Sequence, residues 1–127
     1  MPDDSFLADF EAGRIAPSEF PHELHVLVAW SLSRRYSHEE AFARLATGIK
    51  DIAAHAGIPD KYHETMTRAW FELVSQANSL EAHPELLDRA LLRRYYSRER
   101  LDAGRHAWLE PDLEPLVLAS ATDRSRA

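Results

Sequence analysis

The chain has 127 residues, a hydrophobic fraction of 45% and a formal net charge of −6 from 15 basic and 21 acidic residues. This length and composition predict one folded domain with its own core and exclude a disordered chain. The excess of acidic residues disfavours nucleic-acid binding. No apolar run of about 18 residues occurs, which predicts no membrane span. The absence of cysteine and of signal-peptide features indicates a cytoplasmic protein.

Residues 1–19 are predicted to form a flexible N-terminal arm, because they are acidic and are interrupted by Gly13 and Pro17. One short helical turn over residues 6–10 is the regular structure expected in this arm. The first long helix is predicted over residues 18–36, where apolar side chains recur at steps of three and four.

The second helix is predicted to begin at a capping box in which Ser37 is the N-cap and Glu40 is the third helical residue. Gly57 is expected to end this helix in the left-handed conformation, and Pro59 prevents its continuation. Apolar residues between these ends recur at helical spacing, so one face should pack inward.

Asp60 is then expected to cap a central helix that ends near Ala77 or Leu80. Met66 and Trp70 fall on its inward stripe, and polar side chains run along one edge of that stripe. Polar groups at such positions are the first indication of a functional site.

A fourth helix is predicted over residues 83–96 and a short C-terminal helix over residues 97–109, followed by an extended tail. Residues 119–127 are expected to be frayed. Because no strand-like alternation occurs, the predicted fold class is all-α. We expect a single-domain helical bundle of four main helices plus a short C-terminal helix and the tail, over residues 20–118.

Three histidines form the candidate metal site. His22 and His25 are three residues apart on a predicted helix, so their side chains occupy neighbouring positions and can share one ion. His63, near the start of the central helix, could supply a third ligand. Positions near helix N-termini favour neutral imidazole, which is the form that ligates metals. One divalent transition metal is predicted, with Fe, Zn and Cu all acceptable to imidazole and no metal as the alternative.

This pattern leaves other interpretations open. No His-Glu-x-x-His zinc motif is present, and a dinuclear iron site is weakly indicated because its carboxylates, Glu19 and Asp60, are explained as helix caps. The histidines could instead be structural, hydrogen-bonded to threonines and backbone carbonyls at the edge of the core. A third interpretation is metal-free acid–base catalysis.

The remaining polar and aromatic residues are expected to be less informative. His38 and His83 should be exposed, because one begins a helix and the other precedes a proline. The arginines of segment 89–100 are interpreted as a solvated helix face. Core positions are expected for the three tryptophans, Trp30, Trp70 and Trp108.

Short motifs along the chain resemble a known pattern. They are F-x-H-x-x-H-x-x-x-A-W at residues 20–30, K-Y-H-E-T-x-T at 61–67, Tyr-Tyr-Ser at 95–97, Gly-Arg at 104–105 and Pro-Asp-Leu at 111–113. In these motifs the chain resembles a family of small uncharacterised bacterial all-helical proteins over residues 20–116. The resemblance implies a shared polar pocket without naming a reaction. Gly104 stands where that family's pattern has alanine, which should weaken the last helix.

The leading functional prediction is a small metal-dependent enzyme that acts on a small molecule. The alternatives are a non-enzymatic module for binding a small ligand or a partner, in which the histidines are structural, and a metal-free histidine catalyst. Predicted partners are a small molecule, no nucleic acid and no membrane, with a homodimer as an option. The predicted metal ligands are His22, His25 and His63, the predicted catalytic residues His63, Glu64 and Thr67, and the predicted substrate-binding residues Tyr62, Tyr95 and Arg105.

Overall fold

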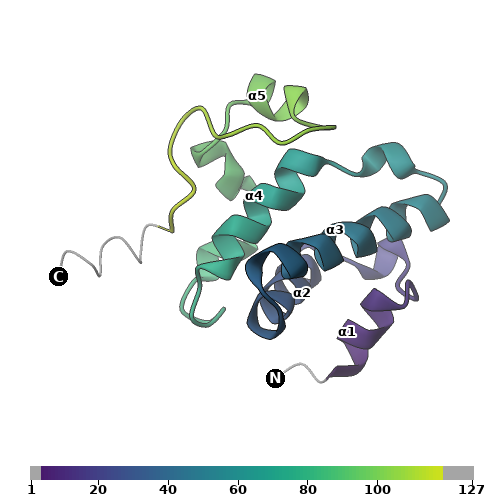
Figure 1. Cartoon of the computed structure of the whole chain (residues 1–127). Helices are drawn as coiled ribbons and strands as arrows, with labels where there is room; N and C mark the ends of the chain where they lie inside the picture. The colour runs from purple at the N-terminus through teal and green to yellow at the C-terminus, as the bar shows by residue number, and fades with distance from the viewer. Residues whose placement is uncertain (1–3, 119–127) are drawn as a thin grey trace. The chain divides into compact units, whose positions relative to one another are not determined.

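The computed structural model describes residues 4–118, and no strand occurs among them (Figure 1). The all-α prediction is therefore confirmed for this part of the chain. None of its helices has both the length and the apolar character that a membrane span requires. The elements are α1 (Asp4–Glu11), η1 (Pro17–Glu19), α2 (His22–Arg35), α3 (His38–His55), η2 (Pro59–Lys61), α4 (Glu64–Ser75), η3 (Pro84–Leu87), η4 (Arg89–Arg94) and α5 (Arg98–Ala103).

The chain divides into two compact units, with the boundary between Tyr62 and His63. The sequence shows no linker at this position, and the boundary was not predicted. Tyr62 belongs to the first unit, where the ammonium group of Lys50 lies 5.1 Å from its ring centroid. His63 opens the second unit as the N-cap of α4. The K-Y-H-E-T-x-T motif is thus shared between two units.

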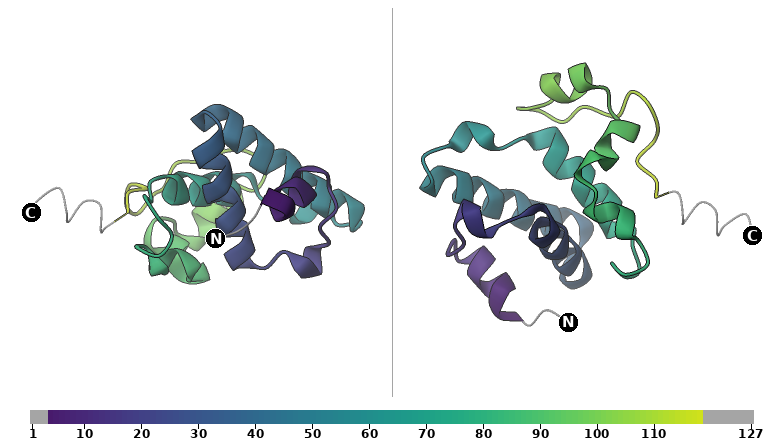
Figure 2. Two further views of the ribbon diagram at one scale, coloured as in Figure 1. Left: turned by 90° about the horizontal axis from the view of Figure 1, so that it is seen from below. Right: turned by 180° about the vertical axis from the view of Figure 1, so that it is seen from behind.

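In the first unit α2 packs on α3, and α1 contacts both helices, as Figure 2 shows from two sides. The helical turn predicted over residues 6–10 is present within α1, but residues 4–11 pack against α2 and α3 and do not form a loose arm. Leu7 and Phe10 are buried, and the Phe10 ring stacks on Phe20 with centroids 5.5 Å apart. Gly48 makes room for this ring, because a Cβ there would lie 2.2 Å from Phe10. An apolar face with helical spacing therefore outweighs the acidic composition of the segment. Residues 1–3 of the predicted arm lie outside the described residues.

The ends of α3 match their local signals, whereas the start of α2 does not. Ser37 Oγ accepts the N–H of Glu40 at 3.3 Å, and Gly57 has φ +76°, so both predicted ends of α3 are confirmed. The predicted start of the preceding helix at residue 18 is wrong. A separate 3₁₀ turn covers Pro17–Glu19, and α2 begins at His22, because prolines at positions 17 and 21 each start a new helical segment.

The second unit is built around α4, which buries Phe71, Leu73 and Val74. The expected cap at Asp60 is wrong, because Pro59 starts a 3₁₀ turn and Tyr62 is extended, so the helix begins only after His63. Met66 is 38% exposed rather than inward, because it lies in the first turn of α4 and lines a groove.

The predicted helix over residues 83–96 consists of two 3₁₀ segments instead. They are separated at Asp88, which has φ −87° and ψ 110° and whose carboxylate accepts the N–H of Ala90 at 2.9 Å. This local hydrogen bond competes with a continuous helix. His83, expected on the surface, is 1% exposed, and Trp108, expected in the core, is 38% exposed.

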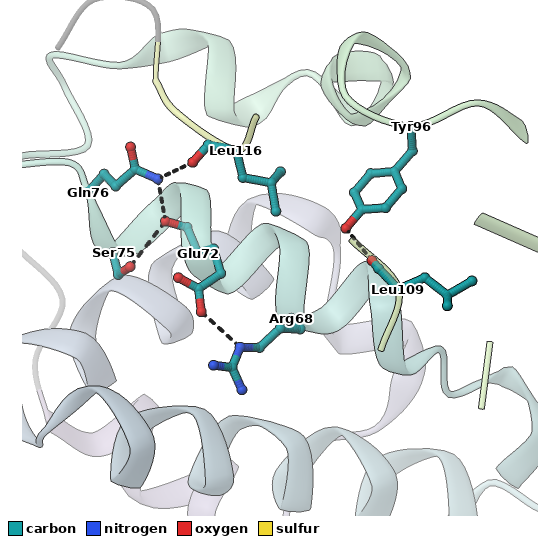
Figure 3. A network of polar contacts seen from close by, with 7 residues as sticks. All are labelled: Arg68, Glu72, Ser75, Gln76, Tyr96, Leu109 and Leu116. Atoms are coloured by element: carbon teal, nitrogen blue, oxygen red, sulfur yellow. Dashed lines mark hydrogen bonds and ion pairs between the residues drawn. The ribbon is translucent and has the colours of Figure 1, made fainter. Parts of the chain in front are cut away.

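The segment after α5 has no regular secondary structure and is held against the second unit by side chains. Predicted to end near residue 109, α5 ends at Ala103 with Gly104 as its C-cap. Gln76 binds this segment twice. Its Nε2 donates to the carbonyl of Leu116 at 2.8 Å (Figure 3). Its Oε1 accepts the N–H of Leu118 at 3.0 Å. The predicted tail is thus present to residue 118 as a segment of bends and irregular structure. Residues 119–127, predicted to fray, lie outside the described part of the chain.

Candidate functional site

His63, the centre of the predicted site, uses both of its ring nitrogens in structural hydrogen bonds. The N–H of Met66 donates to Nδ1 at 3.1 Å, and Nε2 lies 2.8 Å from the carbonyl oxygen of Leu101. These partners require the neutral tautomer with the proton on Nε2. Burial lowers the pKa of His63 below its ordinary value; the Leu101 carbonyl opposes this shift, and Arg105 contributes to it. A metal ion at either nitrogen would displace one of these hydrogen bonds, so His63 does not fit a ligand role in this conformation.

The N-terminus of α4 docks on the carbonyls that follow α5. The N–H of Glu64 donates to the carbonyl of Arg105 at 2.8 Å, and the N–H of Thr65 donates to that of Gly104 at 3.1 Å. The next N–H groups along α4, of Met66 and Thr67, bind Nδ1 and the carbonyl oxygen of His63. The first N–H groups of a helix have no partner within the helix. Here the segment that follows α5 and the His63 ring supply partners for the N–H groups of Glu64, Thr65 and Met66, and the N–H of Thr67 makes the first i→i−4 bond of the helix.

Thr65 is a residue that the sequence analysis missed. It is fully buried, its Oγ1 donates to the carbonyl of Ala107 at 3.0 Å, and the same oxygen accepts the N–H of Leu109 at 3.1 Å. A Cβ at Gly104 would lie 2.3 Å from this oxygen. Glycine at position 104 is therefore required by this close approach and is not merely a weak point of the last helix. The available signal was a short hydroxyl side chain inside an otherwise apolar stripe.

Among the predicted catalytic and substrate-binding residues, Thr67 and Tyr95 also form hydrogen bonds to backbone carbonyls. The hydroxyl of Thr67 donates to the carbonyl of His63 at 2.7 Å. Tyr95 is 1% exposed, its hydroxyl donates to the carbonyl of Val117 at 3.2 Å, and burial raises its pKa. Tyr62 lies in the first unit, and Glu64 is half-buried at the start of α4. These contacts account for Thr67 and Tyr95 without a ligand.

Two further motifs of the sequence bind each other. The N–H and the hydroxyl of Ser97 donate to the two carboxylate oxygens of Asp112 at 2.9 and 2.6 Å, which holds the pKa of Asp112 below its ordinary range. Next to this pair, the N–H of Leu113 donates to the carbonyl of Tyr95 at 3.0 Å, and the hydroxyl of Tyr96 donates to that of Leu109 at 2.8 Å (Figure 3). The Tyr-Tyr-Ser and Pro-Asp-Leu motifs therefore tie the tail to η4 and α5.

The other two predicted metal ligands lie in the first unit. His25 packs edge-on against Phe20 with centroids 4.6 Å apart, and burial, helped by the nearby His22, lowers its pKa to about 4. His25 is thus neutral near pH 7, although burial rather than the helix dipole is the main cause. Within the described residues of either unit, no group of three or more His, Cys, Asp or Glu side chains is placed to hold a metal ion. The three-histidine centre, which would combine residues of both units, stays a prediction.

A groove of about 580 Å³ lies in the second unit, beside His63. Arg93 from η4, Arg98 from α5 and Arg105 from the segment after α5 line it, and Asp102 is the acidic residue among its walls. Arg93 and Arg98 are exposed and make no ion pair with any other residue of the described chain. The complete lining is His63, Met66, Arg93, Tyr96, Ser97, Arg98, Leu101, Asp102, Arg105 and Leu113.

The first unit has a smaller hollow, of about 320 Å³, where α1 and α3 meet. Its arginine is fully engaged: the Arg44 guanidinium binds Glu11 at 2.7 Å and Glu40 at 2.8 Å, and it lies 4.0 Å from the ring centroid of Tyr36. These acidic partners raise the pKa of Arg44. The arginine of this hollow therefore serves a surface ion network that ties α1 to α3.

Comparison with known proteins identifies no relative of this chain. No family model, no curated protein and no solved structure matches it. The resemblance seen in the motifs therefore stays an expectation.

Proposed function

We propose that the second unit is a non-enzymatic binding module that takes an anionic ligand in the groove beside His63. The observation that carries this proposal is the pair Arg93 and Arg98. Both line the groove, both are exposed, and neither has an ion-pair partner among residues 4–118. Arg105, predicted from the sequence to bind an anionic group, lines the same groove. Arg93 and Arg98 alone outweigh the single carboxylate of Asp102 there.

The size and chemistry of the groove support this ligand class. A volume of about 580 Å³ is within the range of about 300–1,000 Å³ that is usual for ligand sites. Guanidinium groups bind carboxylate and phosphate oxygens through two parallel hydrogen bonds. Met66 and Leu113 are 38% and 54% exposed and would contact an apolar part of the ligand.

The state of the reactive side chains favours binding over catalysis. A general base needs a nitrogen or oxygen within hydrogen-bonding reach of its substrate. Both nitrogens of His63 have protein partners, and the hydroxyls of Thr65 and Tyr96 are hydrogen-bonded to backbone carbonyls. The buried polar groups of this unit therefore support the fold, whereas the exposed arginines are left for a ligand.

The test is to measure binding of citrate and of inorganic phosphate by calorimetry at low salt, with the wild-type chain and with Arg93→Gln and Arg98→Gln. Each substitution should weaken binding about tenfold, because one charge-assisted contact is lost. Arg89→Gln is the matched control, since Arg89 is exposed on the same 3₁₀ helix and does not line the groove. Equal binding by all four proteins, or no binding of either anion or of any acidic peptide, contradicts the proposal.

A further inference from the structure

We infer that the natural occupant of the groove is a short acidic segment of a partner protein that also carries an apolar side chain. This inference rests on the proposed function and names the class of its ligand. It combines three observations: the exposure of the groove walls, the separate origins of their charges and the rigid attachment of their apolar residues.

The walls are too exposed for a site that encloses a small molecule. Small-molecule sites usually bury about 70–90% of the ligand surface and present a few buried polar groups that are free to bind it. Arg93, Arg98, Met66 and Leu113 are all exposed, and the buried hydroxyl of Tyr96 already donates to a backbone carbonyl. Arginine and methionine are enriched in protein interfaces relative to the rest of the surface. An extended segment laid along such walls would cover them.

The charges of the groove complement an acidic partner. Arg93 and Arg98, which have no ion pair within the described chain, come from two successive elements, η4 and α5. A segment with several Glu or Asp side chains can offer a carboxylate to each. Because the whole chain carries a net charge of −6, this local excess of positive charge also distinguishes the groove from an otherwise acidic protein.

The apolar contacts are held in place before any partner binds. The N–H of Met66 is bound by His63 Nδ1, and the N–H of Leu113 is bound by the carbonyl of Tyr95. Their side chains therefore project from fixed backbone, which limits the conformational entropy lost on binding. A Leu, Ile or Phe of the partner, placed between acidic residues, is the side chain that these two positions would receive.

The experiment uses the full chain and fluorescently labelled peptides in a polarisation assay. The probe is a short peptide in which pairs of glutamates alternate with single leucines. One control peptide has glutamine in place of glutamate, and a second has serine in place of leucine. We expect the probe to bind, and each control to bind at least about tenfold more weakly, because one loses the ion pairs and the other the apolar contacts.

A charge exchange makes the test specific for the groove. The double variant Arg93→Glu/Arg98→Glu should bind the acidic peptide with about 100-fold lower affinity. It should gain affinity for the equivalent lysine–leucine peptide. Both residues are exposed and have no ion pair within the described chain, so this variant should fold. Arg89→Glu should leave the affinity for both peptides within about twofold of wild type.

The outcomes separate this inference from the proposed function. Binding of citrate or phosphate without binding of the acidic peptide overturns the peptide inference and leaves the anion site in place. Binding of neither overturns both. Peptide binding that survives the double charge reversal places the contact outside the groove and also overturns the inference. A concentration-dependent dimer that competes with the peptide would identify a second copy of the chain as the occupant instead.

Discussion

The hollow of about 320 Å³ in the first unit and the groove in the second unit differ in how their arginines are paired. In the first unit the guanidinium of Arg44 is bound by Glu11 and Glu40 and lies over the ring of Tyr36. In the second unit Arg93 and Arg98 line a groove and have no acidic partner within the described chain. Acidic side chains pair with Arg44 and also with Arg68 and Arg94. Arginines that have no such partner beside a groove are therefore more informative. Unneutralised charge beside a groove therefore points to function better here than the histidines do.

The units also differ in what stabilises them. The first unit uses regular helices and ring contacts, such as Phe10 on Phe20 and Phe20 against His25. The second unit uses side chains that bind distant backbone, as Thr65, Gln76 and Tyr96 do. Disrupting one contact of each kind should show whether the two units depend on packing and on polar contacts to different degrees.

The largest effect on stability is expected from adding a methyl group at Gly104, where the Thr65 side chain lies close to the backbone. Gly104→Ala should destabilise the protein by about 3 kcal/mol, because its Cβ would lie 2.3 Å from Thr65 Oγ1 and would separate α4 from the end of α5. Urea denaturation monitored by tryptophan fluorescence measures this. Ala103→Gly is the control and should cost about 1 kcal/mol through helix propensity alone. Equal losses from both changes would show that the close approach is not important.

The next effect is a pH dependence that originates in the first unit. Because the pKa of His25 is lowered to about 4 from its ordinary 6.5, the unfolded chain binds this proton more readily than the folded chain. The stabilisation is present in full above pH 6.5 and is lost as the pH falls toward 4, by about 2–3 kcal/mol in total. Stability measured across this range should fall less steeply in His25→Leu. An identical slope in the variant would rule out His25 as the source.

The capping role of His63 predicts a somewhat smaller loss in the second unit. His63→Ala should cost about 2 kcal/mol, because the N–H of Met66 loses its acceptor and the carbonyl of Leu101 loses its donor. His63→Asn should recover part of this loss, since asparagine is a good N-cap. Chemical denaturation of the two variants provides the comparison. If asparagine is no better than alanine, the cap is not the main role of this residue.

The same substitution tests the metal prediction. Both His63 nitrogens are engaged, so we expect the metal content of protein purified without chelator to be the same in the wild type and in His63→Asn. Elemental analysis measures it directly. About one Fe, Zn or Cu ion per chain, lost in both His22→Ala and His63→Asn, would instead support the three-histidine centre and the metal-dependent enzyme.

The smallest effects on stability are expected from substitutions of Arg44 and Arg93. These two substitutions compare an ion-paired arginine of the first unit with a groove arginine of the second unit that has no ion pair among the described residues. Arg44→Gln should lower the melting temperature slightly, because it removes the ion pairs that tie α1 to α3. Arg93→Gln should leave the melting temperature unchanged while weakening anion binding. Differential scanning calorimetry with and without citrate distinguishes the two. A stability loss in Arg93→Gln comparable to that in Arg44→Gln would mean that Arg93 has a structural partner.

Much of the candidate site could not be predicted from the sequence, because the pattern does not specify the partners of its polar side chains. His63, Thr67, Tyr95 and Arg105 were selected as unusual polar positions, and their chemistry was assigned to a ligand. The structure shows that the first three bind the protein's own backbone. A polar side chain on an inward stripe needs a partner in either case. The pattern alone does not reveal whether that partner is a substrate or a carbonyl elsewhere in the chain.

What the sequence by itself determined is the local structure: the all-α class, the Ser37 cap and the end of a helix at Gly57. Each depends on residues a few positions apart, where propensity and capping act. Only the tertiary structure decided that His63 meets Leu101, that Thr65 meets Ala107 and Gly104, and that Arg93 and Arg98 share a groove. The two hydrogen bonds join residues 38 and 42 positions apart, and no local rule specifies partners at that separation.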